Sequence, residues 1–228
     1  MALRPVYISP TSANSLLEKK EVKFKWYSGL SVSQKQKSIE SFHNAAKKDL
    51  NLKSILEISS KSKNRLGVNL SAFNLKLNSK NNIKASVEAF FQGSKTFKHG
   101  GPYVDLYEKT AREAKLDQRL LVSGNLVEFS FDNHKWPLSP PTVFYDWLYC
   151  SALLQNNELA KELIHYQAFT DIEFNPKKSI NCQAASAAIF KSLVKQNLIS
   201  KAMKSYSNFI KIHQENIATN TLIQTQLF

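Results

Sequence analysis

Residues 87–97 read VEAFFQGSKTF, and this stretch carries the clearest local pattern in the chain. A helix over 85–97 turns by ~100° per residue, which gathers apolar side chains on one face. It places an acid, a ring, an amide and an amine on another face: Glu88, Phe91, Gln92 and Lys95. Glu88 and Lys95 are two turns apart and project nearly in line, about 10 Å apart along the axis. Such a ridge can line a ligand cleft, although an ordinary solvated helix face has the same spacing.

The sequence on either side predicts a mixture of helices and short strands. Residues 1–30 are irregular or strand-like, and a sparse amphipathic helix is expected over 33–49. Residues 54–77 alternate in the manner of three strands, near 55–58, 66–70 and 73–77. Downstream we expect a strand over 126–131 and helices over 104–115, 142–155, 157–168, 183–196 and 199–215. The fold class expected is α+β, mostly α-helical, in a single domain with a few short strands.

Two loops are candidate ligand contacts. The first contains Gly100, Gly101, Pro102 and Tyr103, where paired glycines allow a close backbone approach to a ligand or simply form a turn. The second spans residues 171–181 and leads into a helix, whose free N–H groups favour anions. Two lysines in that loop add positive charge, but a simply capped loop explains the pattern equally well.

Composition narrows the chemistry. The chain has 228 residues, with 31 basic and 18 acidic side chains, and its net charge of +13 favours an anionic partner or reflects a lysine-rich surface. Two cysteines, Cys150 and Cys182, form no CxxC pair, which fits a reducing compartment. No apolar leader, stretch of about 18 apolar residues, metal-ligand spacing, GxSxG motif or P-loop is present. We therefore expect a cytoplasmic protein with no membrane contact, no metal and no cofactor.

The stretch at 87–97 resembles the signature EHYFQAxKF of the NADAR (YbiA-like) family, with Glu88, Phe91, Gln92 and Lys95 at the family's spacing. LSAF at 70–73 resembles the family's LSNF, and Asn181 matches the end of its WG…GLN segment. The strings LEISSKS, GGPY, WPL, FYDWLY and FTDIEFNPKKSINCQA resemble one branch, the NADAR antitoxins paired with DarT-type toxins. The resemblance covers most of residues 20–195. It implies a NADAR-like catalytic domain over 51–228, with residues 1–50 as an N-terminal extension.

DarT-type toxins attach ADP-ribose to DNA bases, so the resemblance implies an antitoxin that removes ADP-ribose from guanine in DNA. The implied partners are ADP-ribosylated DNA and a possible cognate toxin. Three residues are implied in catalysis: Lys95 as a nucleophile that passes through an imine, with Glu88 and Asp171 as carboxylates. The remaining candidates are implied substrate contacts: Arg65, Ser71, Phe73, Phe91, Gln92, Gly101, Tyr103, Phe174, Lys177 and Asn181.

The chain departs from the family pattern in the second loop. Phe174 stands where the family has a tryptophan, and Asn175 to Lys178 replace a glycine-rich segment that contains an aspartate. Two other functions therefore stay open. One is an N-glycosidase that acts on riboflavin-pathway intermediates, and the other is a non-catalytic binder of ADP-ribosylated DNA or of the toxin.

Overall fold

The computed structural model describes residues 1–10 and 15–221, with side chains described through residue 216. Nine strands occur in this part of the chain: β1 (Ala2–Ile8), β2 (Glu18–Phe24), β3 (Ile55–Glu57), β4 (Lys76–Asn78), β5 (Lys84–Ser86), β6 (Lys95–Phe97), β7 (Leu126–Phe131), β8 (His134–Trp136) and β9 (Ala168–Thr170). The helices there are α1 (Val32–Leu50), α2 (Arg65–Asn69), α3 (Val87–Gly93), the 3₁₀ helix η1 (Val104–Glu108), α4 (Ala111–Leu116), α5 (Arg119–Val122), α6 (Val143–Gln155), α7 (Asn157–Leu163), α8 (Gln183–Lys195), α9 (Ile199–Ala202) and α10 (Tyr206–Thr221). The α+β class is confirmed, with more helix than strand.

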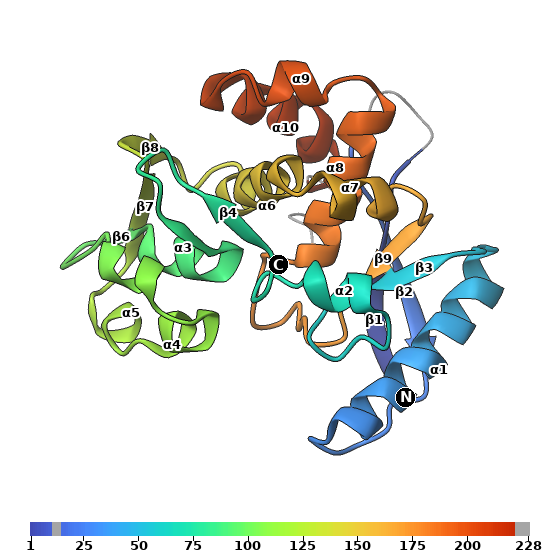
Figure 1. Ribbon diagram of the computed structural model, residues 1–228. Coiled ribbons are helices and arrows are strands. Elements are labelled where there is room, and N and C mark those ends of the chain that lie inside the picture. Colours follow the sequence, from blue (N-terminus) through green and yellow to red (C-terminus); the bar gives the residue numbers. More distant parts are fainter. Residues whose placement is uncertain (11–14, 222–228) are drawn as a thin grey trace.

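The strands form three separate sheets. The largest has the order β2-β1-β9-β3, in which β3 and β9 are parallel and the other neighbours are antiparallel. The second is the pair β4-β5, and the third has the order β6-β7-β8. In Figure 1, β6–β8 lie with α3, α4 and α5 on one side of the molecule, and the largest sheet lies with α1 on the other. Helix α6 runs between these two sides.

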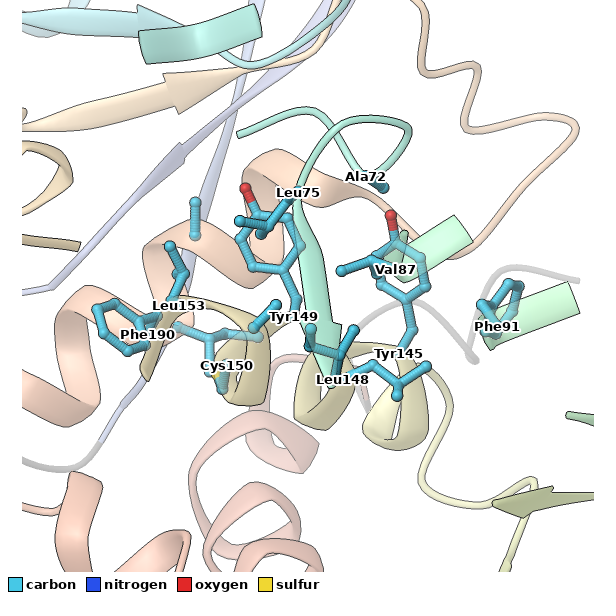
Figure 2. Close-up of a cluster of buried hydrophobic side chains, with 14 of the residues drawn as sticks. Ala72, Leu75, Val87, Phe91, Tyr145, Leu148, Tyr149, Cys150, Leu153 and Phe190 are labelled. Carbon is cyan, nitrogen blue, oxygen red and sulfur yellow. The ribbon is translucent and has the colours of Figure 1, made fainter. Parts of the chain in front are cut away.

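The main hydrophobic core surrounds α6. Figure 2 shows how Tyr145, Leu148, Tyr149 and Leu153 project from this helix toward α3, β4 and α8. The Tyr149 hydroxyl donates a hydrogen bond to the carbonyl of Leu70 over 2.8 Å, so even the polar end of this buried ring is satisfied. Helix α6 therefore packs against α3 and β4 and also against α8, and it connects these elements in one core.

A second, smaller core lies between α1 and the largest sheet. Phe24 of β2 stacks on Phe42 of α1 with ring centroids 4.6 Å apart, and Val6 of β1 is completely buried beside them. Helix α1 is thus fixed to the sheet by its sparse apolar face, as its sequence pattern predicts. The prediction that residues 1–50 form an extension separate from 51–228 stays a prediction, although β1 lies between β2 and β9 in the sheet.

The predicted strand over 126–131 and the helices over 142–155 and 183–196 are confirmed to within a residue or two. The predicted strand at 66–70 is wrong, because Asn64 caps a short helix there by accepting from the backbone N–H of Leu66. The predicted helix over 104–115 is two short helices, η1 and α4. The chain breaks between them because Thr110 begins α4 as its N-cap and forms a capping box with Glu113. The helix over 199–215 is likewise broken, between Ala202 and Tyr206.

Two of the predicted helices end early. Helix α3 stops at Gly93, where a Cβ atom would lie only 2.6 Å from the ring of Tyr107, and the chain then enters β6. Helix α7 ends at Leu163, and the last part of the predicted helix over 157–168 leads instead into β9, which pairs with β3. Both errors have one cause: pairing with a strand distant in the sequence overrides the local helical period. No helix in the described ranges has the length and apolar character needed to cross a membrane.

Candidate active site

A cavity of about 930 Å³ opens between α3, the start of α6, strand β7 and the loop that follows β9. Most of the predicted site residues line it: Ser71, Phe73, Glu88, Phe91, Gln92, Lys95, Asp171, Phe174, Lys177 and Asn181. The fold therefore brings together side chains from positions that span more than 100 residues of the chain. Three predicted residues, Arg65, Gly101 and Tyr103, do not line this cavity.

The α3 ridge forms one wall of the cavity. Ser86 caps the helix by accepting from the backbone N–H of Ala89, and α3 is buried along its whole length. Gln92 donates from Nε2 to Oε1 of Glu88 over 2.9 Å, and Lys95 donates from Nζ to Oε1 of Gln92 over 2.6 Å. The amide thus links the acid to the amine. Lys95 reaches this position from β6, although the sequence places it on the same helix as Glu88.

Two ammonium groups share the Glu88 carboxylate region. Lys115 of α4 lies with its Nζ 3.4 Å from Oε1 of Glu88, and its ammonium lies 5.3 Å from the centre of the Phe73 ring. The Lys95 ammonium lies 4.9 Å from the Phe91 ring. Burial lowers the pKa of Lys95, the Glu88 carboxylate opposes this shift, and the nearby Lys115 charge adds to it. Burial and the Lys115 charge thus shift the balance toward the neutral amine, which is the nucleophilic form.

Asp171 forms the opposite side of the cavity and caps the turn that follows it. Its Oδ1 accepts from the backbone N–H groups of Glu173 (2.9 Å) and Phe174 (3.2 Å), and its Oδ2 accepts from Nε2 of Gln183 over 3.0 Å. Burial raises the pKa of Asp171, the neighbouring Glu57 carboxyl raises it further, and these hydrogen bonds act in the opposite direction. A buried carboxyl with a raised pKa can hold a proton close to neutral pH.

Gln183 connects three segments of the cavity wall, and the sequence did not predict it as a site residue. Besides its bond to Asp171, its Nε2 donates to the carbonyl of Ile58 over 2.7 Å, and its Oε1 accepts from the backbone N–H of Ala72 over 2.7 Å. Lys115 was also missed. Gln183 lies in the family-like string at 169–184, but its role in the wall depends on partners distant in the sequence, and Lys115 belongs to no local pattern.

Aromatic side chains close the cavity at two places. Phe91 packs edge-on against Tyr145 of α6, with centroids 5.1 Å apart, and also contacts Phe129 of β7 at 5.3 Å. Phe174 packs edge-on against Tyr7 of β1 at 6.5 Å. Phe91 and Phe174 are each more than nine-tenths buried and both line the cavity, so they can form part of its apolar floor.

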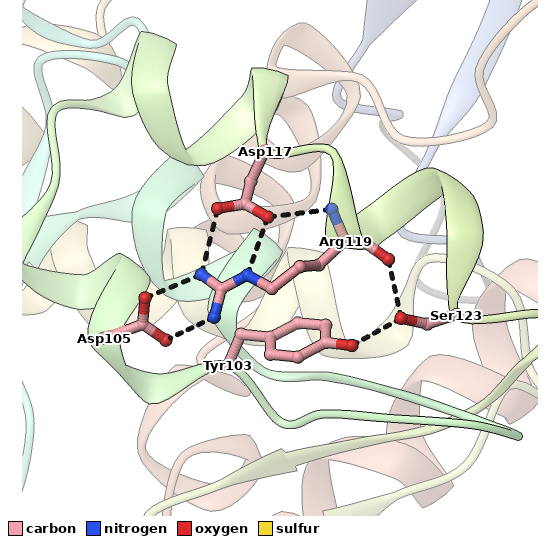
Figure 3. Close-up of polar contacts among 5 residues, drawn as sticks. All are labelled: Tyr103, Asp105, Asp117, Arg119 and Ser123. Carbon is pink, nitrogen blue, oxygen red and sulfur yellow. Dashed lines mark hydrogen bonds and ion pairs between the residues drawn. The ribbon is translucent and has the colours of Figure 1, made fainter.

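Tyr103 serves a structural contact outside the cavity. Its hydroxyl bonds to Oγ of Ser123, and the Arg119 guanidinium lies 4.5 Å from its ring centre (Figure 3). Arg119 in turn is held by Asp105, with its closest contact at 2.6 Å, and by Asp117 (Figure 3). These partners occupy both the ring and the guanidinium of the cluster. Tyr103 does not line the cavity, and its role as a substrate contact stays a prediction.

Gly101 packs closely against the backbone of Lys95. A Cβ atom at this position would lie 2.3 Å from the carbonyl oxygen of Lys95, and its φ of +82° is a conformation that glycine adopts readily. The paired glycines therefore allow the loop to approach the backbone of Lys95, whereas the sequence suggested an approach to a ligand. Arg65 begins α2 and is exposed, away from the residues that line the cavity.

The model of a family described as DarT1-associated NADAR antitoxin matches residues 2–222. No curated protein matches the chain.

Proposed function

Because the chain belongs to the family of DarT1-associated NADAR antitoxins, we propose that it is an enzyme that removes ADP-ribose from guanine bases in DNA. The observation that carries this proposal is the linked series Glu88, Gln92 and Lys95 within one cavity. An amine whose pKa is lowered by burial, linked through an amide to a carboxylate, suits cleavage of an N-glycosidic bond.

In the proposed reaction, Nζ of Lys95 attacks the anomeric carbon of the ribose. The bond from that carbon to the guanine nitrogen breaks, and the leaving nitrogen takes a proton from an acid of the site. The lysine adduct loses its Nζ proton to the ring oxygen as the sugar opens, which gives an imine. Water then adds to the imine carbon and Lys95 leaves as the amine. One water is consumed, and ADP-ribose and guanine in DNA are the products.

The two carboxyls suit different parts of this reaction. Asp171, whose pKa is raised by burial and by Glu57, suits the role of proton donor to the leaving nitrogen. Glu88 accepts from Gln92 and pairs with Lys115, so it suits orientation of the amine and contact with the ribose hydroxyls. This division of roles follows the general rule that environment separates the proton affinities of paired carboxyls.

The cavity also suits the proposed substrate in size and charge. A volume of about 930 Å³ exceeds the need of a single sugar and suits a ligand as large as ADP-ribose. Lys115, Lys177 and Lys178 line it and can meet the two phosphates, and the net charge of +13 favours the DNA strand. We further propose a cognate DarT toxin as a functional partner and a cytoplasmic location.

The test uses an oligonucleotide that carries ADP-ribose on guanine. Wild-type protein is expected to release free ADP-ribose, measured by mass spectrometry, and Lys95→Ala is expected to lose at least about 100-fold of the rate, since the nucleophile is gone. Lys98→Ala is the matched control, because Lys98 is an exposed lysine directly after the same strand and does not line the cavity. Its rate should stay near that of wild type.

Borohydride reduction during turnover tests the imine directly. It should add the mass of a reduced ADP-ribosyl group to the tryptic peptide that contains Lys95, and to no other peptide. If wild-type protein leaves the DNA adduct intact, the proposed activity is wrong. Tight binding of the modified DNA without release of ADP-ribose would instead favour the non-catalytic alternative.

A further inference from the structure

A buried polar network lies behind the cavity wall, and the proposed reaction does not use it. Glu57 of β3 is 3% exposed, and its Oε1 accepts from the backbone N–H of Ile172 over 2.8 Å. Its Oε2 accepts from the hydroxyl of Thr170 over 2.6 Å. The same hydroxyl lies 2.8 Å from Nε2 of His43. Because a hydroxyl has a single proton, which goes to Glu57, Nε2 of His43 must donate to Thr170.

This network joins β3 and α1 to the segment that carries Asp171. Thr170 immediately precedes Asp171, and Ile172 immediately follows it, so both backbone neighbours of Asp171 are tied to the Glu57 carboxyl. Helix α1 adds a second attachment, since Lys35 forms an ion pair with Glu173 at 3.1 Å. The direction of the Asp171 side chain is therefore set from behind by β3 and α1.

The network also places two carboxyls, Glu57 and Asp171, in one buried region. Burial raises the pKa of each, and the proximity of Glu57 raises the pKa of Asp171 further. His43 does not neutralise them, because burial and the nearby Lys47 lower its pKa to about 4 and leave it uncharged at neutral pH. The loss of a proton from one carboxyl therefore opposes its loss from the other.

The remaining titratable groups around this pair leave it without a buried counterion. Glu173 is the other carboxylate, and it is partly exposed and paired with Lys35. The buried phenols and thiol that interact with Asp171 all have pKa values raised by burial, so they stay neutral: Tyr7, Tyr145, Tyr149 and Cys182. The partition of charge in this part of the protein thus depends mainly on Glu57 and Asp171.

We propose that Glu57 is a positioning residue of this site: its carboxyl ties the backbone on both sides of Asp171 to β3 and lies close enough for its charge to act on Asp171. Thr170 donates a hydrogen bond to the Glu57 carboxyl, and His43 connects Thr170 to α1. This inference rests on the proposed function only for its catalytic consequence, because the effect on Asp171 is a property of the free protein. Glu57 does not line the cavity and acts through Asp171.

The test replaces Glu57 with glutamine, which keeps an acceptor for Ile172 and removes the charge. The titration of Asp171 is followed by carbon NMR of its carboxyl, assigned with Asp171→Asn. Glu57→Gln is expected to move the midpoint down by at least about one pH unit, since a like charge in a buried site is removed. Glu173→Gln makes the same chemical change two residues along the loop. It should move the midpoint much less, because Glu173 is more exposed and its influence on Asp171 is smaller.

A second variant covers the case in which Glu57→Gln fails to fold. Thr170→Val removes the donor that stabilises the Glu57 carboxylate, so Glu57 holds its proton more tightly and Asp171 loses its own more easily. The Asp171 midpoint should again fall, by less than in Glu57→Gln. A midpoint that stays in place or rises in either folded variant overturns the inference.

The pH dependence of the turnover rate is a further measurement, and a purely structural role of Glu57 would not shift it. If protonated Asp171 is the acid, the rate falls as pH rises through its pKa, and Glu57→Gln should move this falling limb to lower pH. A falling limb that stays in place while the NMR midpoint moves would overturn the catalytic part. If wild-type protein has no activity, the proposed function fails, and the NMR titration alone then decides the inference about Glu57.

Discussion

Replacing Gly101 by alanine should destabilise the protein through the backbone of Lys95. The glycine has a φ of +82°, and an added Cβ atom would lie 2.3 Å from the carbonyl oxygen of Lys95. An L-residue in this left-handed conformation costs about 1–2 kcal/mol. Relief of the overlap with a backbone atom adds about 1–3 kcal/mol, because a strand carbonyl cannot simply turn away. The expected loss of unfolding free energy is therefore about 2–5 kcal/mol.

Gly124 provides a matched control, since it has the same φ of +82°. A Cβ atom there would meet the Cδ2 atom of His99 at 2.9 Å, and His99 is an exposed side chain that can rotate. Gly124→Ala should therefore cost only the conformational part, about 1–2 kcal/mol. The difference between the two variants isolates the contact with Lys95.

Guanidinium denaturation followed by circular dichroism measures both losses, with ΔG compared at a common m-value. Gly101→Ala should exceed Gly124→Ala by about 1–3 kcal/mol. Equal destabilisation of the two variants would refute the structural role of Gly101. Unchanged stability of Gly101→Ala together with lost affinity for ADP-ribose would instead restore the interpretation of Gly101 as a ligand contact.

Three further predictions concern the charges and the fold. In the proposed reaction the neutral form of Lys95 is the nucleophile, so the rate should rise with pH through its pKa. Lys115→Gln should move this rising limb of kcat/KM to higher pH and Glu88→Gln should move it to lower pH. A shift of both in one direction would contradict the electrostatic argument. Asp146→Ala should lower the unfolding free energy by about 3–5 kcal/mol in a denaturation experiment, because the buried Ser186 and His213 and the half-buried Thr142 lose their acceptor. A loss below about 1 kcal/mol would contradict this. A chain that lacks residues 1–50 should give a poorly dispersed amide NMR spectrum, since the main sheet loses two of its four strands; a native-like spectrum would show that 51–228 folds alone.

The parts of the fold that the sequence predicts are those governed by local periodicity. Helices α6 and α8 each run for 13 residues, long enough for apolar positions to repeat several times, and both were located correctly. The short elements β9 and α2 were assigned wrongly. Three or five residues hold too few repeats, and β9 becomes a strand because it pairs with β1 on one side and with β3 on the other. Such pairing depends on residues more than 100 positions away.

The candidate site follows the same division. The spacing of Glu88, Gln92 and Lys95 pointed to a shared ridge, and the side chains do meet, although Lys95 lies on a strand. The reason is geometric: the strand begins directly after the helix, so Lys95 still lies one short step beyond Gln92. Residues such as Lys115 and Glu57 reach the site region from elements that no local pattern connects to it.

The amide between the acid and the amine resolves a conflict in the site. A carboxylate in direct contact with a lysine favours the ammonium, which has no lone pair with which to attack carbon. Among the described residues Lys95 makes no ion pair with Glu88 within 4.0 Å. Gln92 lies between them: it donates to Glu88 and accepts from Lys95, so it orients the amine although it carries no net charge. The Glu88 carboxylate is instead neutralised by Lys115, whose own charge further discourages protonation of Lys95. Gln92 thus allows Glu88 to fix the direction of the amine and leaves burial free to keep its lone pair available.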